Sequence, residues 1–192
     1  MNGTFGKTSR ILILLGMASL WQSVSGYIDV YSHRFIFPKV DPTLNPAHLS
    51  LYSASVLGLI AVIIWWRTSK REGKGAAGLS LALAGALGEV GSGVLNEIYH
   101  RVYSGTSTLE LVHLSIHGLF VVSMFIVALG GIVGAVSINH SIGQTREGRP
   151  LPSMIFFSSI WLLVVGSISY LGSEFLTGDQ PMIYLGAGSF AV

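Results

Sequence analysis

The sequence ELVHLSIHGLFVVSMFIVALGGIVGAV, residues 110–136, decides the fold class of this chain. After Glu110 it contains no Asp, Glu, Lys or Arg, and it exceeds the roughly 20 apolar residues that a helix needs to cross a bilayer. It forms the core of an apolar segment, 109–137, which predicts a transmembrane helix.

Four more stretches satisfy the same criterion, and they are residues 11–31, 49–66, 76–100 and 153–172. The first could instead be a signal peptide, because Lys7 and Arg10 precede it and Ser23–Gly26 is rich in small residues. No A-x-A cleavage site follows, so we interpret it as a membrane helix. The sequence therefore predicts an all-α polytopic bundle of about five transmembrane helices, with residues 1–192 forming one integral membrane domain.

The composition agrees with this class. Apolar residues make up 51% of the chain and charged residues only 10%, against about 25% charged residues in soluble domains. A soluble globular enzyme and a disordered chain are both excluded. Eleven basic against nine acidic residues do not suggest nucleic-acid binding, so the expected surroundings are the lipid bilayer. The absence of cysteine excludes disulfides, thiolate metal sites, iron–sulfur clusters and covalent c-type haem.

The positions of Lys and Arg predict the orientation, since these residues favour cytoplasmic loops. The densest basic cluster, Arg67–Lys74, directly follows Trp65 and Trp66, which we expect in the interfacial belt. A cytoplasmic N-terminus leaves only Arg34, Lys39 and Arg101 outside. The prediction is a multi-pass protein of the cell membrane with its C-terminus outside.

Polar residues follow single faces of three predicted helices. Offsets of 0, +4, +7 and +11 form one stripe on an α-helix. Two spans carry polar or small residues at these offsets, and a third opens with a shorter stripe: Gln22, Gly26, Asp29 and His33; Glu89, Gly93, Asn96 and His100; Glu110, His113 and His117. His48 begins another span just after Pro46, a residue favoured at a helix start.

These stripes should meet inside the bundle. An Asp or Lys at mid-helix costs about 2.5–3.5 kcal/mol on insertion scales, so such residues face an interior and need partners. Small residues between 78 and 93 allow close helix contact there. Five of the six histidines lie at the predicted outer level, and only His140 is cytoplasmic.

Imidazoles combined with carboxylate and carboxamide groups suit a transition metal. Without thiolates, such a set favours copper(II), zinc or non-haem iron. The candidate metal ligands are Asp29, His33, His48, Asn96, His100, His113 and His117.

Other interpretations use the same residues. Two polar residues four positions apart on one helix, such as Asn96 and His100, are by themselves more typical of interhelical hydrogen bonding than of a metal site. Glu97-x-x-His100 and Glu110-x-x-His113 match the Glu-x-x-His pattern of di-iron bundles, but the required glutamates on two further helices are missing. A b-type haem held by two histidines and a desaturase with His boxes fit less well.

The order of these residues resembles the integral copper-binding subunit of the copper membrane monooxygenases, the family of ammonia monooxygenase and particulate methane monooxygenase. The resemblance covers residues 10–135 and is nearest to the archaeal ammonia-oxidiser form. It is carried by four motifs: Asp29-x3-His33, Asn45-Pro-Ala-His48-Leu-Ser-Leu-Tyr-Ser53, Asn96-Glu-Ile-Tyr-His100 and His113.

The resemblance implies that Asp29, His33 and His48 ligate one copper ion, and that Asn96, His100 and His113 contribute to an adjacent site. It implies that the chain is part of a hetero-oligomeric membrane enzyme that oxidises ammonia or a small hydrocarbon with O2. His117 is an additional candidate, the interval between His33 and His48 is longer than in the family, and residues after the fourth span have no counterpart.

Two other functions stay open. One is a non-catalytic membrane metal-binding or assembly protein, or a degenerate paralogue. The other is a structural or transport bundle in which Glu89 relays protons, although Glu89 could also simply hydrogen-bond Gln22.

Overall fold

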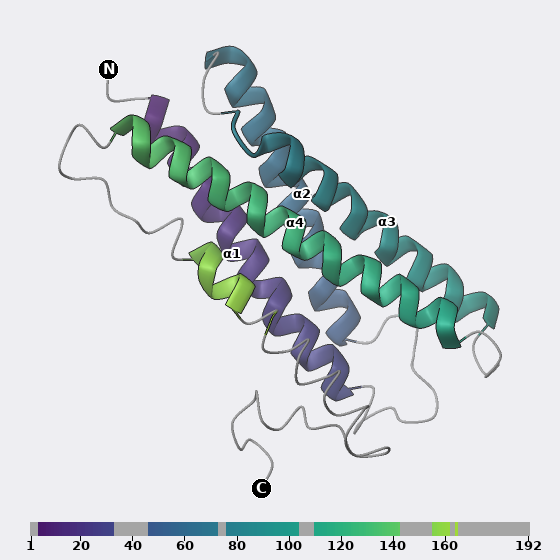
Figure 1. Cartoon of the computed structure of the whole chain (residues 1–192). Helices are drawn as coiled ribbons and strands as arrows, with labels where there is room; N and C mark the ends of the chain where they lie inside the picture. The colour runs from purple at the N-terminus through teal and green to yellow at the C-terminus, as the bar shows by residue number, and fades with distance from the viewer. Residues whose placement is uncertain are drawn as a thin grey trace, which may run out of the picture.

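The computed structural model describes residues 4–32, 46–72, 76–103, 110–142, 155–161 and 164, and the regular structure in these ranges is helical. Its long helices are α1 (Thr4–Tyr31), α2 (Pro46–Glu72), α3 (Leu79–Tyr103) and α4 (Glu110–Ile142). They run alternately up and down the bundle, so α1 and α3 end where α2 and α4 begin (Figure 1).

All four helices are long and apolar enough to cross a membrane, with spans at Gly6–Asp29, Pro46–Arg71, Leu79–Val102 and Ser115–Ile138. The predicted all-α membrane bundle is confirmed for these four. Of the predicted fifth span, 153–172, residues 155–161 are helical beside α1, and most of the remainder lies outside the described residues (Figure 1).

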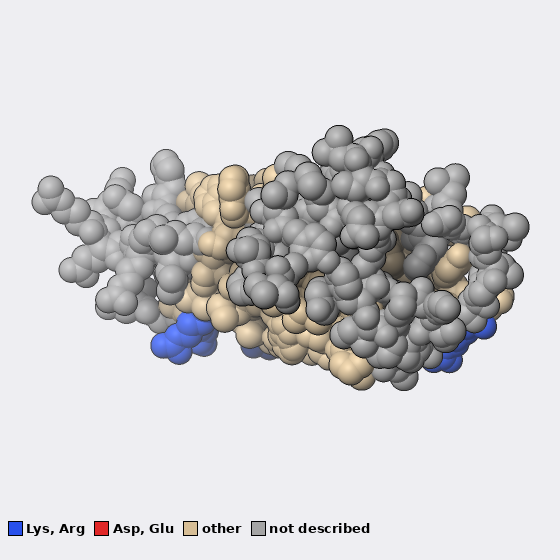
Figure 2. All heavy atoms as spheres, turned by 90° about the horizontal axis from the view of Figure 1, so that it is seen from below, with Lys and Arg blue, Asp and Glu red and all other residues tan. Residues whose placement is uncertain are grey.

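The outer faces of the helices carry large apolar side chains, as lipid contact requires. Among those at least 45% exposed are Met17 and Ile28 on α1, Val56 and Ile60 on α2, Leu87 and Val94 on α3, and Val122 and Val136 on α4. In Figure 2, which views the molecule from below, the visible Lys and Arg side chains lie toward two opposite sides, and the described residues visible between them are neither basic nor acidic.

Local signals in the sequence explain where α2 and α3 begin. α2 starts at Pro46, whose missing N–H costs nothing in the first turn of a helix. Before α3, Gly78 has a φ of 78°, a conformation that side chains disfavour, and its carbonyl accepts a 2.9 Å hydrogen bond from the Ala82 N–H. Glycine at this position therefore permits a tight entry into α3.

Small residues bring the backbones of α3 and α4 together. A Cβ added at Gly85 would lie 2.6 Å from the Val127 nitrogen and 2.7 Å from the Ser123 carbonyl oxygen. On the opposite helix, a Cβ at Gly130 would lie 2.5 Å from the Ala82 nitrogen. The predicted role of small residues on α3 is confirmed here, since close approach of backbones is how membrane helices gain van der Waals contact.

The bundle has an apolar half, where α1 and α3 begin and α2 and α4 end. Its core is built from alanines and large aliphatic and aromatic side chains, namely Leu12, Leu15, Ala61, Val62, Trp65, Leu79, Ala82, Ala86, Val127, Ala128, Ala135, Ile138 and Phe156.

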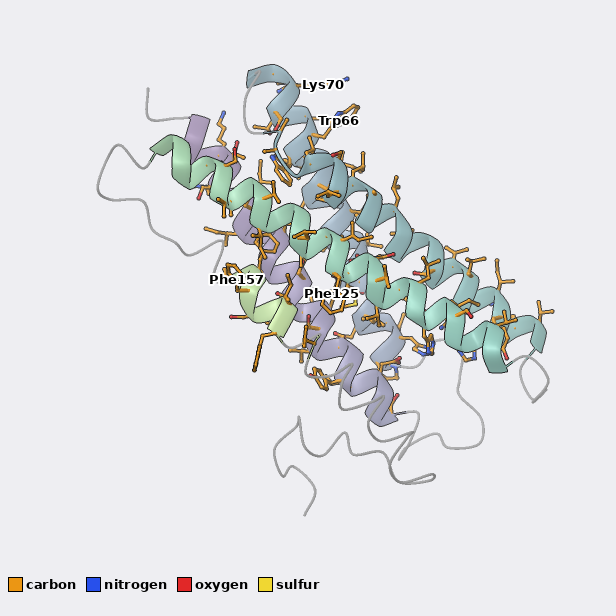
Figure 3. The ribbon with its side chains drawn as sticks, viewed as in Figure 1. Trp66, Lys70, Phe125 and Phe157 are labelled. Carbon is orange, nitrogen blue, oxygen red and sulfur yellow. The ribbon has the colours of Figure 1, made fainter. Side chains whose placement is uncertain are left out.

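The paired tryptophans of α2 take different positions. Trp66 is exposed, and the Lys70 ammonium lies 4.4 Å from its ring centroid, which suits an interfacial residue (Figure 3). Trp65 is fully buried in the apolar half, with its ring packed on Gly134. The prediction that both tryptophans belong to the interfacial belt is therefore wrong for Trp65, because successive helical residues face directions about 100° apart.

Candidate metal centre

The opposite half of the bundle buries polar side chains, and this polar half contains the candidate ligands. It lies where α1 and α3 end and α2 and α4 begin (Figure 1). Its buried polar residues include Gln22, Ser23, Ser25, Asp29, His48, Ser55, Glu89, Ser92, Asn96, His100 and Ser123. The prediction that the polar stripes face the inside of the bundle is confirmed for the stripe residues Gln22, Asp29, Glu89, Asn96 and His100, which are all buried.

Asp29 and His48 form the closest contact between predicted ligands. His48 Nε2 lies 3.1 Å from Asp29 Oδ1, and the His48 side chain is 1% exposed. The two residues come from the end of α1 and the start of α2 and are separated by a connection outside the described residues. Two predicted members of the first ligand set therefore lie within ion-pairing distance.

His100 joins this pair from α3. Its ring centroid lies 5.7 Å from that of His48, with the ring planes tilted by 42°. Tyr52, one turn after His48 on α2, stacks on His48 at 5.8 Å. A carboxylate and two imidazoles from three helices thus share one small buried volume.

Asn96 links α3 to both α2 and α4. Its Nδ2 donates a 3.1 Å hydrogen bond to the Tyr52 hydroxyl. Its Oδ1 lies 3.1 Å from His117 Nε2, at hydrogen-bond distance. The predicted ligands Asn96 and His117 are therefore brought together, and all four helices contribute a side chain to the polar half.

Two of the seven predicted ligands cannot be placed. His33 lies outside the described residues, and His113 belongs to α4 but its side chain is likewise outside the description. Within the described residues, no group of three or more His, Asp or Glu side chains is arranged to hold a metal ion. Each predicted ligand set is thus described only in part, as Asp29 with His48 and as Asn96 with His100.

The chemistry of the described donors fits copper or zinc. A carboxylate oxygen and imidazole nitrogens, without thiolates, are ligands that these metals accept. The donors contact one another, with Asp29 on His48 and Asn96 beside His117. A metal ion would have to replace these contacts with coordination bonds.

A second polar layer lies deeper in the bundle. Gln22 Nε2 donates hydrogen bonds to Glu89 Oε2 at 2.6 Å and to Ser55 Oγ at 2.9 Å. The predicted pairing of Glu89 with Gln22 is confirmed. Ser55 extends it to α2, so that three helices meet through polar side chains.

Sequence reasoning gave no role to Tyr52 and Ser55. A signal for both was available, because His48, Tyr52 and Ser55 have offsets of 0, +4 and +7, the spacing that marked the stripes on the first and third spans. The spacing did not predict an inward α2 stripe, because a serine hydroxyl can bond to a carbonyl of its own helix, as Ser55 does with Leu51, and so needs no partner on another helix.

Glu97 faces away from Asn96, as their adjacent positions predict. Its Oε1 pairs with Arg101 of the next turn at 2.9 Å. The glutamate of the first Glu-x-x-His motif is thus engaged within α3, which does not favour the di-iron interpretation.

Comparison of the chain with known protein families, curated proteins and solved structures found no match. The likeness to the copper membrane monooxygenases therefore rests on the residues quoted above and on their chemistry.

Proposed function

We propose that this chain is the integral copper-binding subunit of a membrane monooxygenase complex. One observation carries the proposal: Asp29 and His48, predicted ligands from different helices, lie 3.1 Å apart with the His100 ring beside them. Polar side chains buried at membrane depth are costly and mark functional sites by default. A purely structural bundle needs no such concentration of imidazole and carboxylate.

Under this proposal the chain supplies ligands and a sheltered position. Asp29, His33 and His48 form one ligand set, and Asn96, His100, His113 and His117 supply the other. Bound copper would provide the redox chemistry by which O2 oxidises ammonia or a small hydrocarbon. Tyr52 orients both sets, because it stacks on His48 and accepts a hydrogen bond from Asn96.

The second candidate is a non-catalytic membrane metal-binding or assembly protein. The direct contacts of Asp29 with His48 and of Asn96 with His117 favour it, because a metal ion must displace them and would be held less tightly. Co-purification with two other integral membrane proteins favours the monooxygenase, whereas a monomer that passes copper to another protein favours the carrier.

The orientation is part of the same proposal. We place the N-terminus in the cytoplasm and the polar half toward the outside, because the basic cluster Arg67–Lys74 begins within the last turns of α2, at the other end of this helix. A tag after Val192 should then be accessible in intact cells, and a tag within Arg67–Lys74 should be protected. The reverse result would place the ligands at the cytoplasmic face.

Metal analysis of the detergent-purified protein tests the function directly. We expect copper in the wild type and loss of most of it in the Asn96→Ala/His100→Ala double variant. His140→Ala is the matched control and should retain all copper, because His140 lies near the other end of α4. Copper unchanged in the double variant, or absent from the wild type purified with copper supplied, would contradict the proposal.

A further inference from the structure

A groove of about 370 Å³ lies between α2 and α3; Asp29 and His48 do not line it, and Tyr52 is the residue that it shares with the candidate metal centre. Its volume is within the range of small-molecule sites, about 300–1,000 Å³. Apolar side chains such as Val90 and Val94 form much of its wall, and Val94 is also exposed on the outer face of α3, so the groove opens at the surface of the bundle. Its polar side chains include two carboxylates, Glu89 and Glu97, so the groove combines an apolar wall with a few polar anchors.

Each carboxylate of this lining has one buried oxygen without a hydrogen-bond partner among the described residues, but only Glu97 has a basic partner in the groove, Arg101. Glu89 differs because it is almost fully buried and has no such partner among the described lining residues. It is 1% exposed, and its Oε2 accepts the hydrogen bond from Gln22. Its other oxygen, Oε1, is buried and has no hydrogen-bond partner among the described residues. A buried polar atom without a partner is costly, which points to a ligand that donates a hydrogen bond.

The charges of the described lining residues favour a cation. Arg101 pairs with Glu97 at 2.9 Å, so that the positive charge in the groove is already balanced. No basic side chain of the described lining is left to balance Glu89. A ligand carrying one positive charge would complete the site.

The few polar groups decide which cation fits. Magnesium and calcium ions require about six or more oxygen ligands. The groove offers oxygens from Glu89, Ser55, Tyr52 and Glu97, and the last three already contact Gln22, Asn96 and Arg101. An ammonium group needs only a few acceptors, and an attached alkyl chain can pack on Val90 and Val94.

We propose that this groove binds a small primary alkylamine, with its ammonium group on Glu89 and its alkyl chain against Val90 and Val94. The site does not depend on copper, so it stands or falls separately from the metal centre.

Equilibrium binding of radiolabelled n-butylammonium to the detergent-purified full chain tests this site. We expect saturable binding that unlabelled n-butylammonium displaces. Tetramethylammonium, which has the charge but no N–H donor, should fail to displace it, and so should sodium and n-butanol. Displacement by any of the three at equal concentration would overturn the proposal, as would a lack of saturable binding.

Two substitutions locate the ligand in the groove. Glu89→Gln should weaken binding about tenfold or more, the size expected for a hydrogen bond to a charged group. Glu97→Gln, the same change in the same groove, should weaken it less than about threefold, because Arg101 already balances that carboxylate. Equal binding by wild type and Glu89→Gln would overturn the assignment.

Val90→Phe narrows the groove without touching a carboxylate. It should weaken butylammonium binding while leaving methylammonium binding unchanged, because only the longer chain reaches that wall. This dependence on chain length also guards against a general folding defect, which would weaken both ligands equally. Equal weakening of both ligands would contradict the proposed position of the chain.

Discussion

The two halves of the bundle are built from opposite ends of the same four helices, and they differ in how the helices contact one another. In the apolar half, helices contact through side chains such as Leu12, Trp65 and Ala82 and through closely approaching backbones. In the polar half, they meet through Asp29 and His48, through Asn96, and through Gln22 with Glu89. Because lipid is as apolar as leucine, packing holds the first half together, while the second half buries groups that need partners.

The difference suggests different roles for the two halves, with helix packing in the apolar half and ligand binding in the polar half. Interhelical hydrogen bonds in membranes contribute only about 0.6 kcal/mol each on average. The polar half therefore adds little to the stability of the bundle, although it buries many polar groups. The apolar half can therefore anchor a bundle whose other end is free to bind ligands. Substitutions in the two halves should separate stability from binding.

The largest effect on stability should come from Trp65→Ala, in the apolar half. Removing a fully buried tryptophan ring leaves a cavity and costs about 3–5 kcal/mol. Trp66→Ala is the matched control and should cost about 1 kcal/mol or less, the size of its cation–π contact with Lys70. Unfolding in detergent measures both, and equal losses would break the distinction between the two tryptophans.

Gly85→Leu should have the next largest effect. The added side chain meets the α4 backbone at Val127 and must push the helices apart, at about 1–3 kcal/mol. Gly91→Leu is the control on the same helix, because an added Cβ at Gly91 meets nothing within 4 Å. The same unfolding measurement should show little change for the control, and a loss equal to that of Gly85→Leu would contradict close packing of α3 on α4.

Asp29→Ala should change binding more than stability. Loss of a negatively charged ligand should weaken copper binding by at least the roughly 10–100-fold lost with outer-shell partners, while the apo protein loses an ion-pair contact with His48. Copper titration and unfolding of the metal-free protein measure the two effects. Asp29→Asn, which keeps an oxygen but loses the charge, should lie between wild type and Asp29→Ala. Unchanged copper affinity in Asp29→Ala would mean that the polar half is structural.

Ser92→Ala should have the smallest effect, although Ser92 is buried in the polar half. Among the described residues, its hydroxyl bonds only to carbonyls of its own helix, Gly88 at 2.7 Å and Glu89 at 3.0 Å. Such local bonds contribute little to helix association, so we expect a change below about 0.5 kcal/mol in unfolding and none in copper binding. A larger loss would indicate that polar contacts stabilise this half more than proposed.

Much of the fold and part of the site followed from the sequence. Helical periodicity placed Asp29, Asn96 and His100 on inward faces, and the structure confirms their burial. The positions of Tyr52 and Ser55 were equally periodic but were missed, since a hydroxyl in an apolar helix does not by itself reveal a partner. Periodicity tells which residues share a face of one helix, but not which residue of another helix meets that face.

The sequence by itself determined the helical membrane class, because lipid offers the backbone no hydrogen-bonding partner and a continuous apolar segment of about 20 residues can satisfy its own backbone as a helix. It also determined which faces are polar, through spacing alone. Only the tertiary structure decided that His48 lies against Asp29, that Gln22 bridges Ser55 and Glu89, and that Trp65 is buried while Trp66 is not. These outcomes depend on the depth and rotation at which α1, α2 and α3 pack, and helix packing fixes both through side-chain shape and glycine contacts distributed over the whole bundle.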